Sequence, residues 1–202
     1  LSARTVQYLH AILRRALGQA ERWGMVQRNV ARLVSPPRVV KPDIQPLTPI
    51  ETKKLLAGIS GDRLEALYTV ALALGLRQGE ALGLRWEDVN LEAGTLSVKN
   101  ALQKTGADEY VLVPPKTDKS RRILKLPEIC VAVLKAHLER QVEEKVRLQE
   151  VWSNKWNLVF TNEDGSPLSR YAVTSRFQRL LERLGIKKHR FHDLRHTAAT
   201  LL

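Results

Sequence analysis

Three clusters of polar residues combine side chains that could bind a phosphate group and help to break one of its ester bonds. The first cluster spans Gly75–Glu80 and sets Arg77 between two glycines, at the junction of two predicted helices. A guanidinium there can bind two phosphate oxygens at once, beside the outward-pointing N–H groups of a helix start. Glu80, three residues later, can lie on the same face and hold Arg77 in place. Taken alone, an ordinary surface ion pair at helical spacing is the simpler explanation.

The second cluster spans Lys116–Arg122 and lies in a predicted turn between two strands. Lys116 could carry an ammonium group into a cleft, where a lysine with a tuned pKa can act as a general acid. Taken alone, this segment is better explained as a basic, solvated hairpin.

The third cluster spans His192–His196, with His189 shortly before it. His192 and Arg195 are i,i+3 neighbours on a predicted helix, so they could together donate a proton and neutralise charge on a phosphate. The spacing His-Asp-x-x-His also resembles the zinc-protease motif His-Glu-x-x-His. Asp193 is one methylene shorter than the glutamate of that motif, and Arg195 would place a cation beside the metal. A metal-dependent hydrolase is therefore the weakest alternative, and no metal is expected.

The composition favours a partner that carries many negative charges. The 202 residues include 33 Lys and Arg against 21 Asp and Glu, a formal net charge of +12. Apolar residues make up 44%, too many for a disordered basic tail. No apolar run approaches the ~18 residues of a membrane span, and a single cysteine, Cys130, excludes a disulfide framework. We expect a soluble, globular protein of a reducing compartment.

The excess positive charge is concentrated in three blocks. Residues 1–42 carry a net charge of +7, residues 99–125 carry +4 and residues 176–202 carry +5, whereas the segments between them are slightly acidic. A merely solvated surface would mix the signs more evenly. The blocks fit a positively lined cleft assembled from distant segments.

The hydrophobic spacing predicts mostly helices. The first residues form an amphipathic helix that stops at Gly24, and a proline-rich segment follows it. Capping boxes are expected at Thr48–Glu51 and at Asp62–Glu65, and the charged outer face over 139–150 of the longest helix is expected to be solvated. The later helices are predicted to run from Thr48, from Asp62 to Gly75, over 78–84, from Pro127 to about Val151, from Ser169 to Gly185, and from Phe191 onwards.

Three short segments with β-branched or alternating residues predict one small, three-stranded antiparallel sheet. These segments are Thr95–Lys99, Glu109–Val113 and Arg122–Leu126. The expected fold class is therefore mostly α with this sheet.

In their order and spacing, the three clusters resemble the motifs of the tyrosine recombinase (phage integrase) family. The first resembles that family's Gly-Leu-Arg-x-Gly-Glu, with Leu-x-Trp-x-Asp-Val following it over Leu84–Val89. The second resembles Lys-Thr-x-x-Ser-x-Arg, and the third, over His192–Thr197, resembles His-x-Leu-Arg-His-Thr. The resemblance implies the integrase catalytic-domain fold over 48–202, a linker over 35–47, and the C-terminal part of a helical core-binding domain over 1–34.

The resemblance further implies DNA cleavage and rejoining through a covalent 3′-phosphotyrosyl intermediate, without metal or other cofactor. Arg77 and Arg195 would clamp the scissile phosphate, and Lys116 would protonate the departing 5′ oxygen. His192 would assist proton transfer. Glu80 and His196 are the expected supporting residues.

The implied partner is double-stranded DNA, and the resemblance implies that the protein binds it as a tetramer. The protein is expected to be prokaryotic or phage-encoded, to act in the cytoplasm and to involve no membrane. The basic residues expected to bind DNA are Arg14, Arg15, Arg22, Lys119, Arg121, Arg122, Lys187, Lys188 and Arg190.

The tyrosine nucleophile of that family follows the third cluster, whereas Tyr8, Tyr68, Tyr110 and Tyr171 all precede it. Tyr68 and Tyr171 are expected in the core. We therefore expect a recombinase fragment that lacks its nucleophile and is inactive alone. The alternative is a DNA-binding module that occupies recombination sites without cleaving them.

Overall fold

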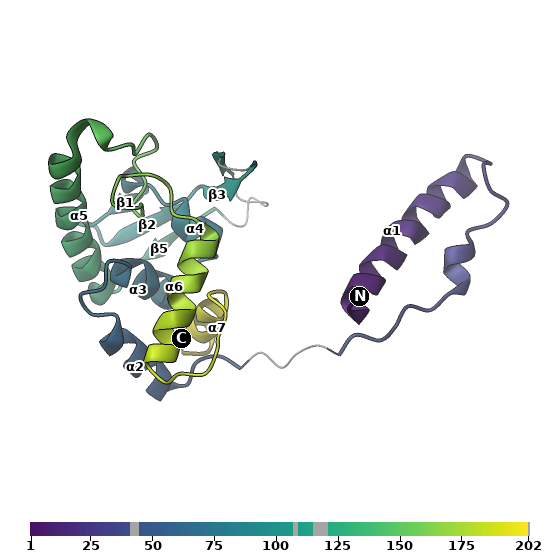
Figure 1. Cartoon of the computed structure of the whole chain (residues 1–202), viewed down its shortest axis with the longest axis horizontal. Helices are drawn as coiled ribbons and strands as arrows, with labels where there is room; N and C mark the ends of the chain where they lie inside the picture. The colour runs from purple at the N-terminus through teal and green to yellow at the C-terminus, as the bar shows by residue number, and fades with distance from the viewer. Residues whose placement is uncertain (41–44, 107–108, 115–120, 202) are drawn as a thin grey trace. The chain divides into compact units, whose positions relative to one another are not determined.

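The chain, examined as a computed structural model, forms two compact units, Leu1–Ile44 and Gln45–Leu202 (Figure 1). The structure describes residues 1–40, 45–106, 109–114 and 121–201. Lys116, the expected proton donor, and Lys119, an expected DNA-binding residue, lie outside these ranges.

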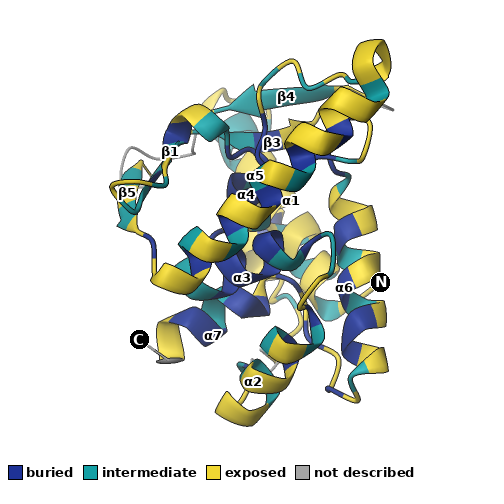
Figure 2. Cartoon of the chain, turned by 90° about the vertical axis from the view of Figure 1, so that its left-hand side faces the viewer, coloured by how far each residue is buried: buried dark blue, intermediate teal, exposed yellow. Residues whose placement is uncertain are grey.

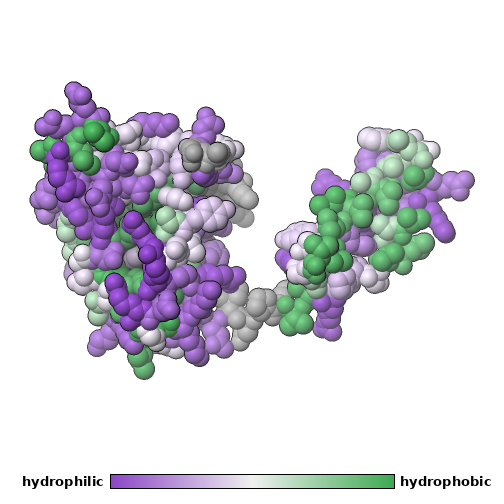
Figure 3. Space-filling model, viewed as in Figure 1, coloured by the Kyte–Doolittle hydropathy of each residue, from purple (hydrophilic) through white to green (hydrophobic). Residues whose placement is uncertain are grey.

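The first unit is built on helix α1, Ala3–Arg22. A 3-10 helix, Val30–Leu33, packs beside it because Asn29 donates from Nδ2 to the Arg14 carbonyl at 2.7 Å and accepts from Ala31 N–H at 3.1 Å. No residue of α1 is buried, and apolar side chains lie open over the unit in Figure 3. The predicted helix is confirmed, and its apolar face has little cover within this unit.

The second unit contains six α-helices among the residues that the structure describes. The predicted capping box at Thr48 is confirmed, since Thr48 Oγ1 accepts from Glu51 N–H at 3.2 Å and Glu51 accepts from Thr48 N–H at 2.9 Å. The predicted capping box at Asp62 is absent, so this prediction is wrong. Gly61, at φ +75°, donates its N–H to the Glu65 carboxylate at 2.8 Å, and the Asp62 carboxylate accepts from Leu64 N–H at 2.8 Å; Leu64 holds the N-cap position without a side-chain hydrogen bond. The helices are α2 (Pro49–Gly58), α3 (Glu65–Leu74), α4 (Gln78–Leu82), α5 (Glu128–Leu148), α6 (Arg170–Arg183) and α7 (Asp193–Leu201), with 3-10 turns at Trp86–Asp88 and Gln149–Val151.

Helix α3 lies at the centre of this unit, buried on almost every side (Figure 2). Tyr68 of α3 packs in a ring cluster with Phe177 and Phe191, at centroid distances of 5.5 and 6.2 Å, so its predicted core position is confirmed. The same expectation for Tyr171 is wrong. It is 82% exposed because the buried stripe of α6 runs through Val173 and Phe177 on another face.

A three-stranded antiparallel sheet is present, but its membership differs from the prediction. Its order is β1–β2–β5, formed by Val89–Asn90, Thr95–Val98 and Arg122–Lys125. Residues Tyr110–Val113 (β4) instead pair with Ala101–Lys104 (β3) in a separate two-stranded sheet.

The separate sheet follows from a close approach between β3 and the end of α4. A Cβ on Gly83 would lie 2.5 Å from the Leu102 nitrogen, so only glycine lets the two backbones pack this tightly. Because β3 packs against α4, it does not join the sheet that contains β2, and β4 pairs with β3 instead.

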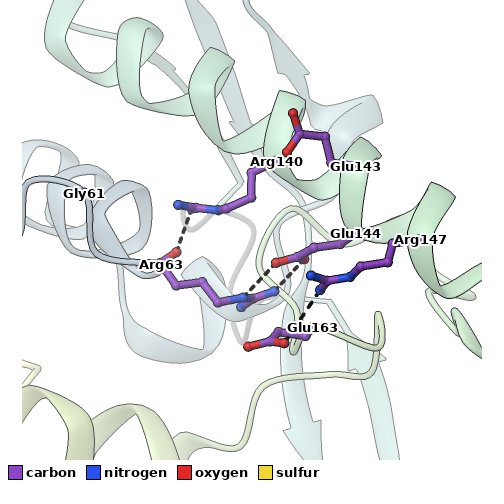
Figure 4. A pocket seen from close by; sticks show the side chains of 7 residues that line it. All are labelled: Gly61, Arg63, Arg140, Glu143, Glu144, Arg147 and Glu163. Carbon is purple, nitrogen blue, oxygen red and sulfur yellow. Dashed lines mark hydrogen bonds and ion pairs between the residues drawn. The ribbon is translucent and has the colours of Figure 1, made fainter.

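The face of α5 that was expected to be solvated contains a buried polar network. Gln141 accepts from the Trp86 indole N–H at 2.6 Å and donates to the Val159 carbonyl at 3.0 Å. Arg63 binds both carboxylate oxygens of Glu144, at 3.0 and 2.7 Å (Figure 4). The expectation is wrong only at Gln141 and Glu144, because the loop 158–161 passes beside α5 with carbonyls that need donors. The other charged residues of this face are exposed as predicted, namely Glu139, Glu143, Lys145, Arg147 and Glu150.

His137 belongs to this network, and its burial predicts that the folded protein loses stability in acid. Its Nε2 lies 2.7 Å from the Val159 carbonyl, and burial, followed by the charge of Arg140, lowers the His137 pKa to about 4. A lowered pKa in the folded state means that the stabilisation is complete above pH 6.5 and is lost as the pH falls towards 4. Between pH 7.5 and 5 we expect the free energy of unfolding to fall by about 2 kcal/mol because of this group.

Urea unfolding of the wild type and of His137→Gln at both pH values measures this effect. The glutamine keeps an N–H donor for Val159 but does not titrate. The variant should therefore lack the pH-dependent part, and equal slopes in the two proteins would refute the assignment to His137.

Candidate phosphate-binding site

The first cluster lies where α3 gives way to α4. Gly75 ends α3 in the left-handed conformation, at φ +60°, and Arg77 caps α4. The Arg77 backbone N–H donates to Glu80 Oε2 at 3.0 Å, and its Nη1 donates to Glu80 Oε1 at 2.7 Å. Glu80 is 4% exposed, whereas the Arg77 side chain is 51% exposed. The carboxylate thus holds the guanidinium from below and leaves part of it open to solvent.

Arg195 reaches the same junction from α7. Its Nη1 donates to the Gly75 carbonyl at 2.7 Å, and a Cβ on Gly75 would lie 3.6 Å from Arg195 Cγ. Burial, followed by the positive charge of Arg77, lowers the pKa of Arg195 from its usual value. Two arginines that are far apart in the sequence therefore meet at the junction of α3 and α4.

A third guanidinium belongs to this group. Arg122, at the start of β5, donates from Nη2 to Glu80 Oε2 at 3.0 Å. The sequence placed Arg122 with the DNA-contacting residues and missed this contact. Three guanidiniums around one buried carboxylate leave an excess of positive charge, which favours a bound anion.

The prediction that both histidines of the third cluster lie on one helix is wrong: His192 lies in the turn just before α7, and His196 lies on α7. The rings of His192 and His196 are 5.2 Å apart and nearly perpendicular. Burial, followed by the charges of His196 and Arg195, lowers the pKa of His192, so the neutral imidazole is favoured. A neutral imidazole can accept a proton during a reaction.

Asp193 has a structural partner. Its carboxylate accepts from the Arg190 backbone N–H at 2.7 Å and binds the Arg190 guanidinium at 3.0 Å. Within the described ranges, no group of three His, Cys, Asp or Glu side chains is arranged to hold a metal ion.

The other basic residues lie at several places on the surface. Arg121, Lys187 and Lys188 are exposed, and Arg190 is exposed while paired with Asp193. On the first unit, Arg14, Arg15 and Arg22 are exposed. A shallow groove there is lined by Ala11, Arg14, Arg15, Gly18 and Arg32. The sequence missed Arg32, although it falls in the first basic block.

No helix in the described part of the chain has both the length and the apolar character needed to cross a membrane.

Comparison with known proteins decides the family. Residues 46–202 match the family model described as the phage integrase family, which covers the whole site. The chain belongs to the phage integrase family. This confirms the resemblance to tyrosine recombinases drawn from the three motifs, and the fold is mostly helical with small antiparallel sheets, as in other family members.

Curated relatives of the phage integrase family align with the whole chain. A "Tyrosine recombinase XerC-like" protein of Caldanaerobacter subterraneus subsp. tengcongensis is 31% identical over 100% of the chain and 56% of its own length. An integrase of Streptomyces ambofaciens is 32% identical over 100% of the chain and 53% of its own length. The chain therefore spans about half the length of these relatives.

A solved structure shares the integrase fold. The Tn1549 transposon integrase, solved in complex with transposon right end DNA, has a TM-score of 0.81 over 100% of this chain and 67% of that one, at 20% identity. At this identity the likeness concerns the fold.

Proposed function

We propose that this chain is the DNA-cleaving and rejoining core of a site-specific recombinase, with Arg77 and Arg195 as the clamp on the scissile phosphate. The observation that carries the proposal is the meeting of these two arginines at Gly75, with the buried Glu80 holding Arg77. Family membership and the DNA complexes of the Tn1549 integrase support double-stranded DNA as the partner.

The proposed reaction forms a bond between a tyrosine oxygen and phosphorus while the bond to the 5′ oxygen breaks. Negative charge grows on the non-bridging oxygens, and two fixed guanidiniums can offset it. Lys116 would give a proton to the departing 5′ oxygen, and neutral His192 would take the proton of the attacking hydroxyl. The phosphotyrosyl bond conserves the energy of the broken ester, so rejoining reverses these steps without ATP or a metal.

The nucleophile is proposed to be a tyrosine outside the present sequence. Tyr68 is buried against Phe177 and Phe191, which removes it from any phosphate. Tyr171 of α6 and Tyr110 of β4 line a hollow whose lining residues include neither Arg77 nor Arg195.

The remaining assignments follow from the same proposal. Residues 48–202 would be the catalytic domain, residues 35–47 a linker, and residues 1–34 part of a helical DNA-binding domain. From family membership we also propose that the protein assembles as a tetramer on DNA. It would act in the cytoplasm, as a prokaryotic or phage-encoded protein.

The proposal can be tested without knowing the target site. The full-length protein is produced in bacteria, and DNA attached to it is recovered under denaturing conditions with no added crosslinker. We expect fragments that share one end sequence, joined by a 3′-phosphate to a tyrosine in the mass spectrum of the nuclease-treated protein. As a control, Arg195→Gln should remove the attached DNA and retain non-covalent binding. Sequence-specific DNA binding without any covalent product would instead support a DNA-binding module that does not cleave.

A further inference from the structure

Arg122 and Arg77 share one carboxylate, and the division of its oxygens decides how Arg77 is presented. Glu80 Oε1 accepts from Arg77 Nη1 at 2.7 Å, whereas Oε2 accepts from Arg122 Nη2 at 3.0 Å and from the Arg77 backbone N–H at 3.0 Å. In the described structure, the Arg77 guanidinium therefore binds Glu80 through a single nitrogen. Its other N–H groups stay available.

A carboxylate left alone with an arginine favours a different arrangement. Two parallel N–H···O bonds form a fork, which is the stronger and more specific geometry. A fork between Arg77 and Glu80 would turn two guanidinium nitrogens inward and compensate the charge of Arg77 more completely. The bond from Arg122 occupies the oxygen that such a fork needs.

We propose that Arg122 is a positioning residue that keeps Arg77 free to bind phosphate by occupying Glu80 Oε2. This inference rests on the proposed phosphate-binding role of Arg77. It gives Arg122 a function in the site that a surface contact with DNA would not have.

The burial of the contact supports this role over a DNA contact. The Arg122 side chain is 24% exposed and Glu80 is 4% exposed, so their ion pair lies beneath the more open Arg77. Burial opposes the charge of Glu80, and the hydrogen bond from Arg122 is the largest influence that lowers the pKa of this carboxyl. Arg122 thus helps to keep Glu80 ionised, which Arg77 requires as a partner.

Arg147 of α5 provides a matched control, since its side chain is 65% exposed, it carries the same charge and it has no role in the proposed site. Arg122→Met keeps most of the side-chain length and removes the donor and the charge, and Arg147→Met makes the identical change away from the site. Inorganic phosphate is titrated into the 202-residue chain, and the guanidinium NMR signals of Arg77 and Arg195 report its binding.

We expect Arg122→Met to raise the Kd for phosphate about tenfold and Arg147→Met to change it less than twofold, because removal of a charge-assisted hydrogen bond outweighs a solvent-screened charge. In the absence of phosphate, rotation of the Arg77 guanidinium should slow in Arg122→Met, as the fork with Glu80 forms. In a Glu80→Gln background, Arg122→Met should have no additional effect on phosphate binding. Arg122→Lys, with a single point donor, should lie between the wild type and Arg122→Met.

Equal losses of affinity in Arg122→Met and Arg147→Met, or unchanged rotation of Arg77 in Arg122→Met, would overturn the inference. If Arg122→Met does not fold, Arg122→Lys is used for the same decision: its Arg77 rotation must be slower than in the wild type. If phosphate perturbs neither Arg77 nor Arg195 in the wild type, the proposed function fails. The rotation of Arg77 without phosphate still decides on the role of Arg122.

Discussion

Arg77→Lys in the full-length protein should lower the rate of DNA cleavage by at least about 100-fold while changing DNA affinity less than about threefold. Lysine keeps the positive charge but loses the planar fork that binds two phosphate oxygens. It also cannot both reach Glu80 Oε1, which Arg77 contacts at 2.7 Å, and present further donors in a fixed plane. Single-turnover cleavage and equilibrium binding, on the site recovered from covalently attached DNA, give the two numbers.

Arg147→Lys is the control for this experiment, because Arg147 is an exposed arginine outside the clamp and outside the expected DNA-binding residues. It should change cleavage and binding by less than about threefold each. If Arg77→Lys lowers binding as much as cleavage, Arg77 only anchors DNA and the transition-state role is wrong.

Arg63→Ala should lower the free energy of unfolding of the second unit by about 3–5 kcal/mol. The substitution leaves Glu144, whose side chain is 9% exposed, without its counter-charge, and the Thr161 carbonyl without the donor that lies 2.6 Å away. Cys130 is the single cysteine and is fully buried in α5, so the rate at which its thiol becomes reactive in urea reports unfolding of this unit alone.

Two further variants separate the buried pair from an ordinary surface pair. Arg147→Ala should cost less than about 1 kcal/mol, because Arg147 is 65% exposed and its Glu163 partner is 3.8 Å away. Replacing both Arg63 and Glu144 with methionine should recover much of the lost stability, since no unpaired charge then remains buried. A loss for Arg63→Ala no larger than that for Arg147→Ala would show that the pair does not stabilise the fold.

The sequence was most informative where local signals decide the structure. Thr48 and Pro49 marked a helix start by capping chemistry alone, and Gly75 marked a helix end because its left-handed backbone suits glycine. The candidate phosphate-binding site was predicted from the sequence motifs that contain Arg77 and Arg195.

Features that depend on tertiary contacts could not be predicted in this way. The pairing of β4 with β3 depends on the close approach at Gly83, and the burial of Glu144 depends on Arg63, which lies far away in the sequence. The contact of Arg122 with Glu80 likewise joins two motifs that the sequence treats separately. Each of these residues looks like an ordinary surface residue until its partner is known.

In the proposed reaction, the guanidinium of Arg77 compensates charge on the reacting phosphate. The most direct test compares cleavage by the wild type and by Arg77→Gln on two substrates, one with the normal phosphate and one with an uncharged methylphosphonate at the cleaved position. We predict that the substitution costs at least about 100-fold on phosphate and less than about tenfold on methylphosphonate, where less negative charge has to be compensated. The same loss on both substrates would contradict the claim.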